Sequence, residues 1–117
     1  MRHRKKGQSL GRTKAPREAL LRNLATSVVL YESVKTTEAK AKAVKPIVEK
    51  MVTASRKNDL HTRRKLLGYF YDENAVKKLL EELGPRYLER PGGYMRITRL
   101  GRRAGDGAPV VQLEFVK

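Results

Sequence analysis

Hydrophobic residues recur at helical spacing along two long stretches of the chain. Between residues 17 and 31 the apolar positions follow a period near 3.6, and Pro16 stands where a first helical turn tolerates proline. Residues 38–57 contain Pro46, which removes one backbone donor, so we expect one helix with a bend there. The apolar stripe of this second helix is the clearest in the chain and consists of Val44, Ile47, Val48, Met51 and Val52.

Two shorter helices are predicted downstream. Asn58-Asp59 supplies a stop and a new N-cap, so residues 60–70 read as a third helix that turns Leu60, Leu67 and Phe70 toward the core. Asp72 can cap a fourth helix, which Gly84-Pro85 is expected to end. The stripe of this fourth helix consists of Ala75, Val76, Leu79, Leu80 and Leu83.

Three segments have the pattern of strands. Residues 33–37 are short, alternating and rich in branched side chains, and Thr37 can cap the following helix. Residues 94–100 and 110–116 form a predicted hairpin whose connection, 101–109, is a long basic loop. These elements predict an α+β fold with about four helices packed on a small three-stranded mixed sheet.

Charge divides the chain into an arm and a domain. The 117 residues include 27 Lys and Arg against 12 Asp and Glu, a formal net charge of +15. Seven of these cations precede the first acid, Glu18, and like charges at this density repel unless they are neutralised. We therefore expect an extended basic N-terminal arm at residues 1–15, which does not fold alone, and a single globular domain at residues 16–117.

Several functional classes are excluded by what the sequence lacks. There is no cysteine, and the two histidines, His3 and His61, are far apart, so neither a nucleophile triad nor a metal or cofactor site is indicated. The glycines near residues 92 and 105 lack the spacing and the Lys of a nucleotide-binding loop and indicate turns. No apolar run is long enough for a membrane span or a signal peptide, so we expect a cytoplasmic protein. Because no catalytic group of residues is indicated, we also expect that the protein is not an enzyme.

The basic clusters call for a polyanionic partner. Besides the arm, they lie at residues 63–65, between residues 86 and 99, and at Arg102-Arg103, and the planar guanidinium of Arg suits bidentate phosphate contacts. Folded RNA is the leading hypothesis, and a DNA-binding or nucleoid-associated protein is the alternative, because the helix pair around Asn58 could read a groove. Tyr94 is the best candidate for base stacking, although a half-buried strand residue is the commoner role for such a tyrosine.

Motifs along nearly the whole chain carry a family resemblance. They include the opening Met1-Arg2-His3 and the stretches 17–25, 34–42, 85–87, 90–97 and 105–109, of which residues 34–42 (VKTTEAKAK) are the most specific. By these motifs the chain resembles bacterial ribosomal large-subunit protein seventeen. Val34 stands where isoleucine is commoner in that family, which is a conservative exchange.

The resemblance implies a structural constituent of the large ribosomal subunit. Its expected partners are the large-subunit (23S-type) rRNA near the nascent-peptide tunnel exit and the neighbouring ribosomal proteins, with no membrane and no small-molecule substrate. By analogy with the family, and from the basic clusters, we expect RNA contacts from Arg2, His3, Arg4, Lys5, Lys6, Arg12, Lys14, Arg17, Arg22, Lys40, Lys42, Arg63, Arg64, Arg90, Tyr94, Arg96, Arg102 and Arg103.

Overall fold

The structure is a computed structural model that describes residues 14–70 and 72–116, with only the backbone of Lys14 described. A π-helical turn, η1, joins the last two helices. In chain order the elements are α1 (Lys14–Tyr31), β1 (Ser33–Thr37), α2 (Glu38–Ser55), α3 (Leu60–Tyr69), α4 (Glu73–Lys78), η1 (Leu79–Leu83), α5 (Gly84–Arg86), β2 (Met95–Arg102) and β3 (Pro109–Phe115).

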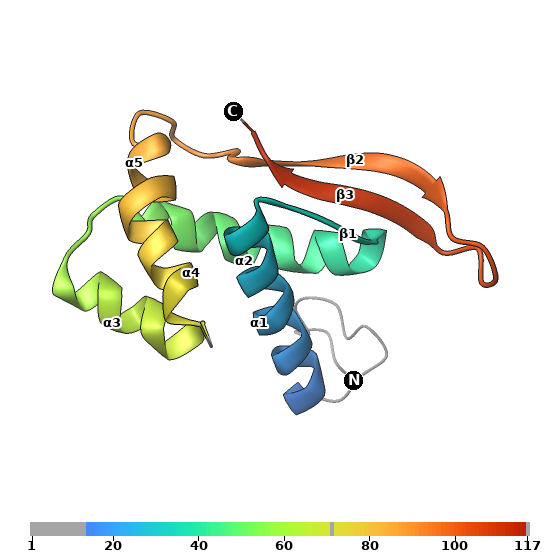
Figure 1. Cartoon of the computed structure of the whole chain (residues 1–117), viewed down its shortest axis with the longest axis horizontal. Coiled ribbons are helices and arrows are strands. Elements are labelled where there is room, and N and C mark those ends of the chain that lie inside the picture. Colours follow the sequence, from blue (N-terminus) through green and yellow to red (C-terminus); the bar gives the residue numbers. More distant parts are fainter. Residues whose placement is uncertain (1–13, 71, 117) are drawn as a thin grey trace, which may run out of the picture.

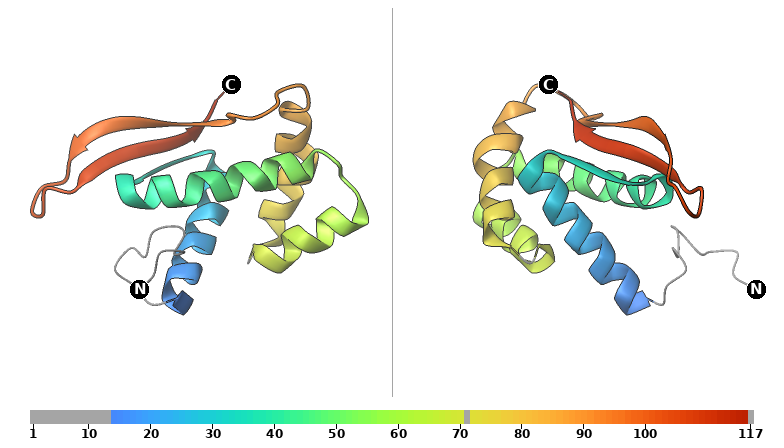
Figure 2. Two further views of the ribbon diagram at one scale, coloured as in Figure 1. Left: turned by 180° about the vertical axis from the view of Figure 1, so that it is seen from behind. Right: turned by 45° about the vertical axis from the view of Figure 1, so that its right-hand side comes forward.

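Helix α2 lies at the centre of the molecule. The sheet runs along one side of it, while α1, α3 and the segment from α4 to α5 surround its other sides (Figures 1 and 2). Val44, Val48 and Val52 of its predicted stripe are buried, and Ile47 and Met51 are half-buried. Pro46 lies within this single helix. The burial of the predicted stripe confirms that this face of α2 packs into the core.

The sheet has the order β1-β3-β2, and both of its strand pairs are antiparallel, so the mixed pairing that we expected is wrong. The central strand β3 alternates as predicted, with Val111, Leu113 and Phe115 buried. The α+β class with an antiparallel sheet is otherwise confirmed. Beyond its contact with α2, the β2–β3 hairpin extends away from the helices and forms one end of the long axis (Figure 1).

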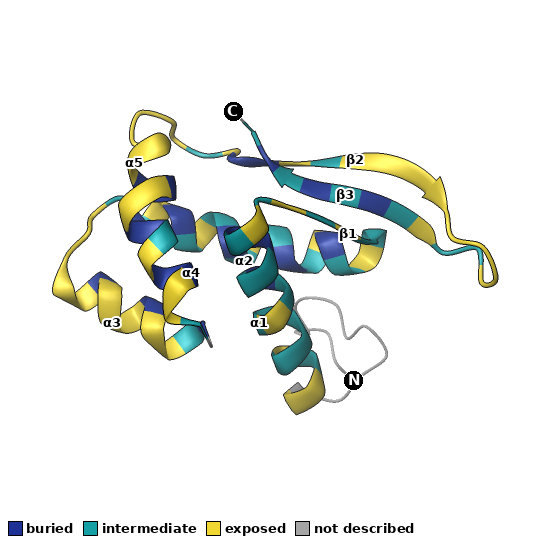
Figure 3. Cartoon of the chain, in the orientation of Figure 1, coloured by how far each residue is buried: buried dark blue, intermediate teal, exposed yellow. Residues whose placement is uncertain are grey.

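The core lies between α2, the inner face of the sheet and the inner faces of the other helices (Figure 3). All five residues of the fourth predicted stripe, from Ala75 to Leu83, are buried in it. Tyr87 and Phe115 complete the core near the C-terminal end of β3, with ring centroids 6.1 Å apart. No helix in the described residues is long and apolar enough to cross a bilayer.

Helix α3 turns a different face inward from the one that we predicted. Asp59 caps it as expected, accepting a 2.8 Å hydrogen bond from the Thr62 backbone N–H. However, Leu60 is 62% exposed and Leu67 is 42% exposed, whereas Leu66 is fully buried. Residues 60 and 67 share one helical face, and residues 62 and 66 lie on another, about 130° further around the helix axis. Of the three predicted core residues, only Phe70 is buried.

Three predicted helix ends also differ. Helix α1 begins at Lys14 and thus includes the last two residues of the predicted arm. Thr37 occupies the N-cap of α2, but its side chain makes no capping hydrogen bond. Gly84 does not end the fourth helix, because the chain passes through η1 and continues to Arg86, with Pro85 in the first turn of α5. Gly84 is instead buried, where a Cβ would lie 2.7 Å from the Ser55 carbonyl oxygen.

Candidate nucleic-acid interface

The β2–β3 hairpin carries a line of arginines. Arg96 and Arg99 are exposed on opposite faces of β2, because alternate residues of a strand point to opposite sides. Arg96 pairs with Glu114 across the strands at 2.8 Å and lowers the pKa of that carboxyl. Arg99 is 83% exposed and lies 3.8 Å from Glu38 of α2. The hairpin therefore offers guanidinium groups on both of its faces.

The tip of the hairpin is held by its own hydrogen bonds. Arg102 donates to the Gly107 carbonyl at 2.8 Å, and Arg103 makes two contacts with the Asp106 carboxylate, at 2.5 and 3.1 Å. Asp106 also accepts a bond from the Ala108 N–H at 3.1 Å. These donors, Arg103 above all, lower the pKa of Asp106 to about 2, so the carboxylate stays charged and the two predicted arginines keep fixed positions.

The beginning of α2 brings further predicted residues beside the root of the hairpin. Lys42 pairs with Glu38 at 2.8 Å, one helical turn away, and is the main cause of the lowered pKa of Glu38. Lys40 is half-buried on the same helix. Since Glu38 also faces Arg99, a single carboxylate serves two cations here, and the net charge at the root of the hairpin is positive.

The basic patch on α3 lies at the other end of the molecule. Arg63, Arg64 and Lys65 are all exposed, and they have no ion-pair partner within residues 15–70 and 72–116. Figure 1 places α3 and the tip of the hairpin at opposite ends of the long axis, along which the molecule extends 44 Å. The predicted contact residues therefore do not form one patch but several separate ones.

Two predicted contacts lie on α1. Arg17 is half-buried near the start of the helix. The guanidinium carbon of Arg22 lies 5.0 Å from the centre of the Tyr69 ring, so this arginine bridges α1 and α3 in a cation–π contact. Arg22 thus has a structural role in the packing of two helices.

Tyr94 is a correction to the predicted site. Its side chain is fully buried, and its ring centroid lies 5.1 Å from that of Tyr87. Its hydroxyl lies 3.0 Å from the hydroxyl of Thr53 and accepts a 3.4 Å hydrogen bond from Arg56. The ring is therefore a core element with a satisfied polar end, and it is not accessible for stacking on a base. A tyrosine next to two glycines carries no sequence signal that separates these two roles.

Among the other predicted residues, Arg90 is exposed in the loop after α5. The predicted arm contacts, namely Arg2, His3, Arg4, Lys5, Lys6 and Arg12, and the side chain of Lys14, lie outside the described residues.

Exposed acids gather on one side of the fold. Glu73, Glu81, Glu82 and Glu89 follow the outer surface from α4 to the loop after α5, and none has an ion-pair partner in the described part of the chain. Most of the other acids are paired with cations or, as Asp59 is, with a helix N-terminus. Glu73, Glu81 and Glu82 therefore make the surface of α4 and η1 unfavourable for a polyanion, whereas the hairpin, the beginning of α2 and α3 attract one.

One basic residue of the predicted clusters has a different role. Arg86 makes a bidentate contact with Glu32, at 2.5 and 3.2 Å, and Lys78 reaches the same carboxylate at 3.0 Å. Arg86 is the largest cause that lowers the pKa of Glu32, to about 2. Lys78 also donates to the Leu30 carbonyl at 2.9 Å, so the group ties the end of α1 to α4 and α5.

Comparison with known proteins gives a consistent result. The family model for ribosomal protein L17 matches residues 20–116. The large ribosomal subunit protein bL17 of Caldanaerobacter subterraneus subsp. tengcongensis is 52% identical over 109 residues, covering 93% of this chain and 97% of that protein. The bL17 protein of Thermomicrobium roseum is 50% identical over 116 residues, which cover 99% of each chain. The bL17 protein of Syntrophus aciditrophicus is 48% identical over 117 residues, which cover this whole chain and 94% of that protein.

Proposed function

Because the chain belongs to the ribosomal protein L17 family, whose cited relatives are named as large-subunit proteins, we propose that it binds large-subunit rRNA as a structural constituent of the subunit. We further propose that it lies near the exit of the nascent-peptide tunnel, in contact with neighbouring ribosomal proteins, as the family resemblance implies. Its place in the cell is then that of the bacterial ribosome, the cytoplasm.

The observation that carries the proposal is the separation of exposed cations over the length of the fold. The patch on α3 and the hairpin are too far apart to serve one phosphate, and both project from a packed core. Such an arrangement fits an RNA that folds around the protein and is contacted on several sides. Phosphate contacts then position the protein, and the shape of the RNA supplies selectivity.

The relatives are named as ribosomal proteins, which supports a structural rather than an enzymatic role. In the described residues no three His, Asp or Glu side chains come together as a metal site would require.

The alternative hypothesis, a DNA reader, rests on the pair α2 and α3. Helix α3 does expose Arg63, Arg64 and Lys65, but these consecutive residues point to different sides of the helix. The helix also exposes Leu60 and Leu67, and its cations are not accompanied by the Asn or Gln side chains that read adenine edges. We therefore favour RNA.

Two measurements test the function. Tagged full-length protein at native level should sediment with the large subunit in gradients, and its absence from that fraction would refute the proposal. In competition at matched salt, folded large-subunit RNA should displace duplex DNA. If about eight phosphates are neutralised, the logarithm of the affinity should fall with log salt at a slope of about −6 to −7. Preference for duplex DNA would support the alternative.

A further inference from the structure

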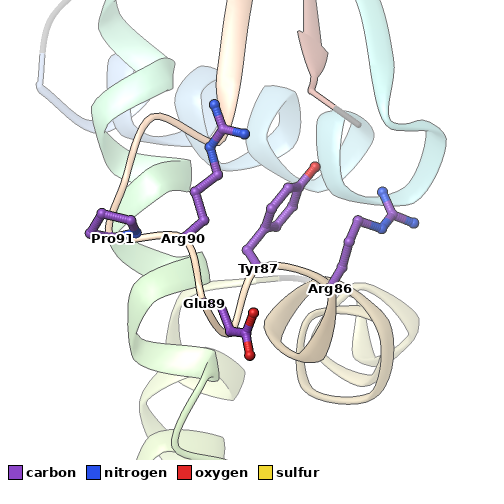
Figure 4. A pocket seen from close by; sticks show the side chains of 5 residues that line it. All are labelled: Arg86, Tyr87, Glu89, Arg90 and Pro91. Atoms are coloured by element: carbon purple, nitrogen blue, oxygen red, sulfur yellow. The ribbon is translucent and has the colours of Figure 1, made fainter.

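The loop that follows α5 forms a pocket beside the core. Arg86, Tyr87, Glu89, Arg90 and Pro91 line it, and its volume is about 340 Å³. Figure 4 shows the side chains of Arg86, Tyr87 and Arg90 directed to the same side of the loop, while the Glu89 carboxylate points the other way. The opening is therefore flanked by two guanidinium groups.

One wall of this pocket is rigid. The Tyr87 hydroxyl donates a hydrogen bond to the Val116 carbonyl, and its ring packs on Tyr94 and Phe115. Arg86 lies 5.9 Å above the Tyr87 ring and is held by Glu32. This wall is consequently formed before any ligand arrives, which reduces the entropic cost of binding.

The other wall is formed by Arg90, which is exposed and has hydrogen-bonding groups without a partner among the described residues. Arg90 donates from Nε to the Gly92 carbonyl at 3.3 Å, which orients its guanidinium plane. Within residues 15–70 and 72–116 no hydrogen bond or ion pair engages its two terminal nitrogens. A planar cation that is oriented but not satisfied is a suitable surface for a nucleobase, because guanidinium groups stack on bases in RNA recognition.

We propose that this pocket receives a single unpaired nucleotide of the large-subunit RNA, with its base stacked on the guanidinium of Arg90 and bounded on the other side by Arg86 and Tyr87. This inference rests on the proposed RNA-binding function and assigns it a site at which one base is held. The size of the pocket suits one nucleotide and excludes a duplex. The pairing of Arg86 with Glu32 favours a base over a second phosphate at that wall, because the charge of Arg86 is already balanced.

The test uses large subunits purified from cells whose only copy of the protein is wild type, Arg90→Ala, Arg90→Lys or Arg99→Ala. Bases are probed with dimethyl sulfate and a guanine-specific dicarbonyl reagent, and the amount of the protein in each subunit is measured by mass spectrometry. Arg90→Ala should increase the reactivity of one or two unpaired bases about tenfold, as expected when one stacking contact is lost. Arg90→Lys should do nearly the same, because it keeps the charge but not the plane.

Arg99→Ala is the matched control, since it removes one exposed arginine elsewhere and should leave these bases protected. If Arg90→Lys keeps full protection, Arg90 contacts a phosphate and the stacking site is refuted. The proposal is equally refuted if no base responds to Arg90→Ala while the protein is present in the subunits. If wild-type protein is itself absent from the subunits, the proposed function fails and not merely the pocket. Unchanged melting of purified Arg90→Ala protein would establish that the fold is intact.

Discussion

Replacing Glu32 by glutamine should destabilise the fold in a way that depends on pH. Glu32 lies at the junction of α1 and β1 with φ of 63°, and its carboxylate holds both Arg86 and Lys78. Glutamine keeps the shape of the side chain and one acceptor oxygen but leaves the two cations facing each other. The variant thus removes the charge without creating a cavity.

The size of the effect follows from the pKa of Glu32, which falls from its usual 4.5 to about 2. For a fully buried pair this change corresponds to about 3 kcal/mol of stability at neutral pH. Because the side chain is 35% exposed, solvent screening reduces the expected loss in the variant to about 1 to 2 kcal/mol.

The pH dependence has a definite sign. A carboxyl whose pKa is lower in the folded state stabilises the protein above its unfolded pKa, and this contribution is lost as the pH falls through the folded pKa. The difference in free energy of unfolding between wild type and Glu32→Gln should therefore be complete above about pH 6, less than half as large near pH 3 and absent below about pH 2.

Urea denaturation of both proteins at several pH values, followed by circular dichroism, measures this difference. Glu89→Gln is the matched control, since Glu89 is exposed and has no partner among the described residues, and it should change stability by less than about 0.5 kcal/mol. Equal stability of Glu32→Gln and wild type at pH 7 would refute the reasoning. A deficit that persists unchanged at pH 2 would show that the amide, rather than the lost charge, causes it.

Three further predictions concern stability and the arm. Gly84→Ala should lower the free energy of unfolding by about 1 to 3 kcal/mol, because the added Cβ would meet the Ser55 carbonyl. Gly68→Ala has open space around the added Cβ and should raise the free energy of unfolding by about 0.5 to 1 kcal/mol. Thermal melts would compare the two variants. Leu66→Ala should lower the free energy of unfolding, measured by urea denaturation, by about 2 to 4 kcal/mol, and Leu67→Ala should lower it by less than about 1 kcal/mol. The reverse order would show that Leu67, as we first predicted, faces the core. Deleting residues 1–13 should weaken RNA binding strongly and leave the melting of the core nearly unchanged, and a large loss of thermal stability would place the arm within the folded domain.

The sequence predicted those parts of the fold in which one period dominates. The stripe of α2 and the alternation of Val111, Leu113 and Phe115 each have a single apolar face, so burial follows directly from spacing. Helix α3 is different, because its leucines lie on two different faces and only packing against its neighbours decides between them. Gly84 was misread for a similar reason: glycine permits both a helix end and a close approach, and the choice depends on Ser55, which is distant in sequence.

In the candidate site, too, some features could be predicted from the local sequence, whereas others depend on residues that are distant in the chain. Composition led us to expect a polyanionic partner, which stays a prediction, and the structure shows that the cluster at residues 63–65 is exposed. Which cations are free cannot be read locally, because Arg86 is paired with a glutamate 54 residues away. Equally, nothing beside Tyr94 in the sequence reveals that Thr53 and Arg56 satisfy its hydroxyl.

The distribution of the acids explains how so basic a chain can keep a rigid core. Glu32, Glu38 and Glu114 each pair with cations that join separate elements of the fold, so these acids reduce repulsion at the contacts between helices and strands. The cations of α3 have no such partner among the residues that the structure describes, so a bound polyanion would supply their counter-charge. On the proposed function, the cations of α3 serve RNA binding, whereas the cations paired with these acids also serve stability. Neutralising one of these acids should loosen the fold, whereas neutralising a cation on α3 should weaken binding alone.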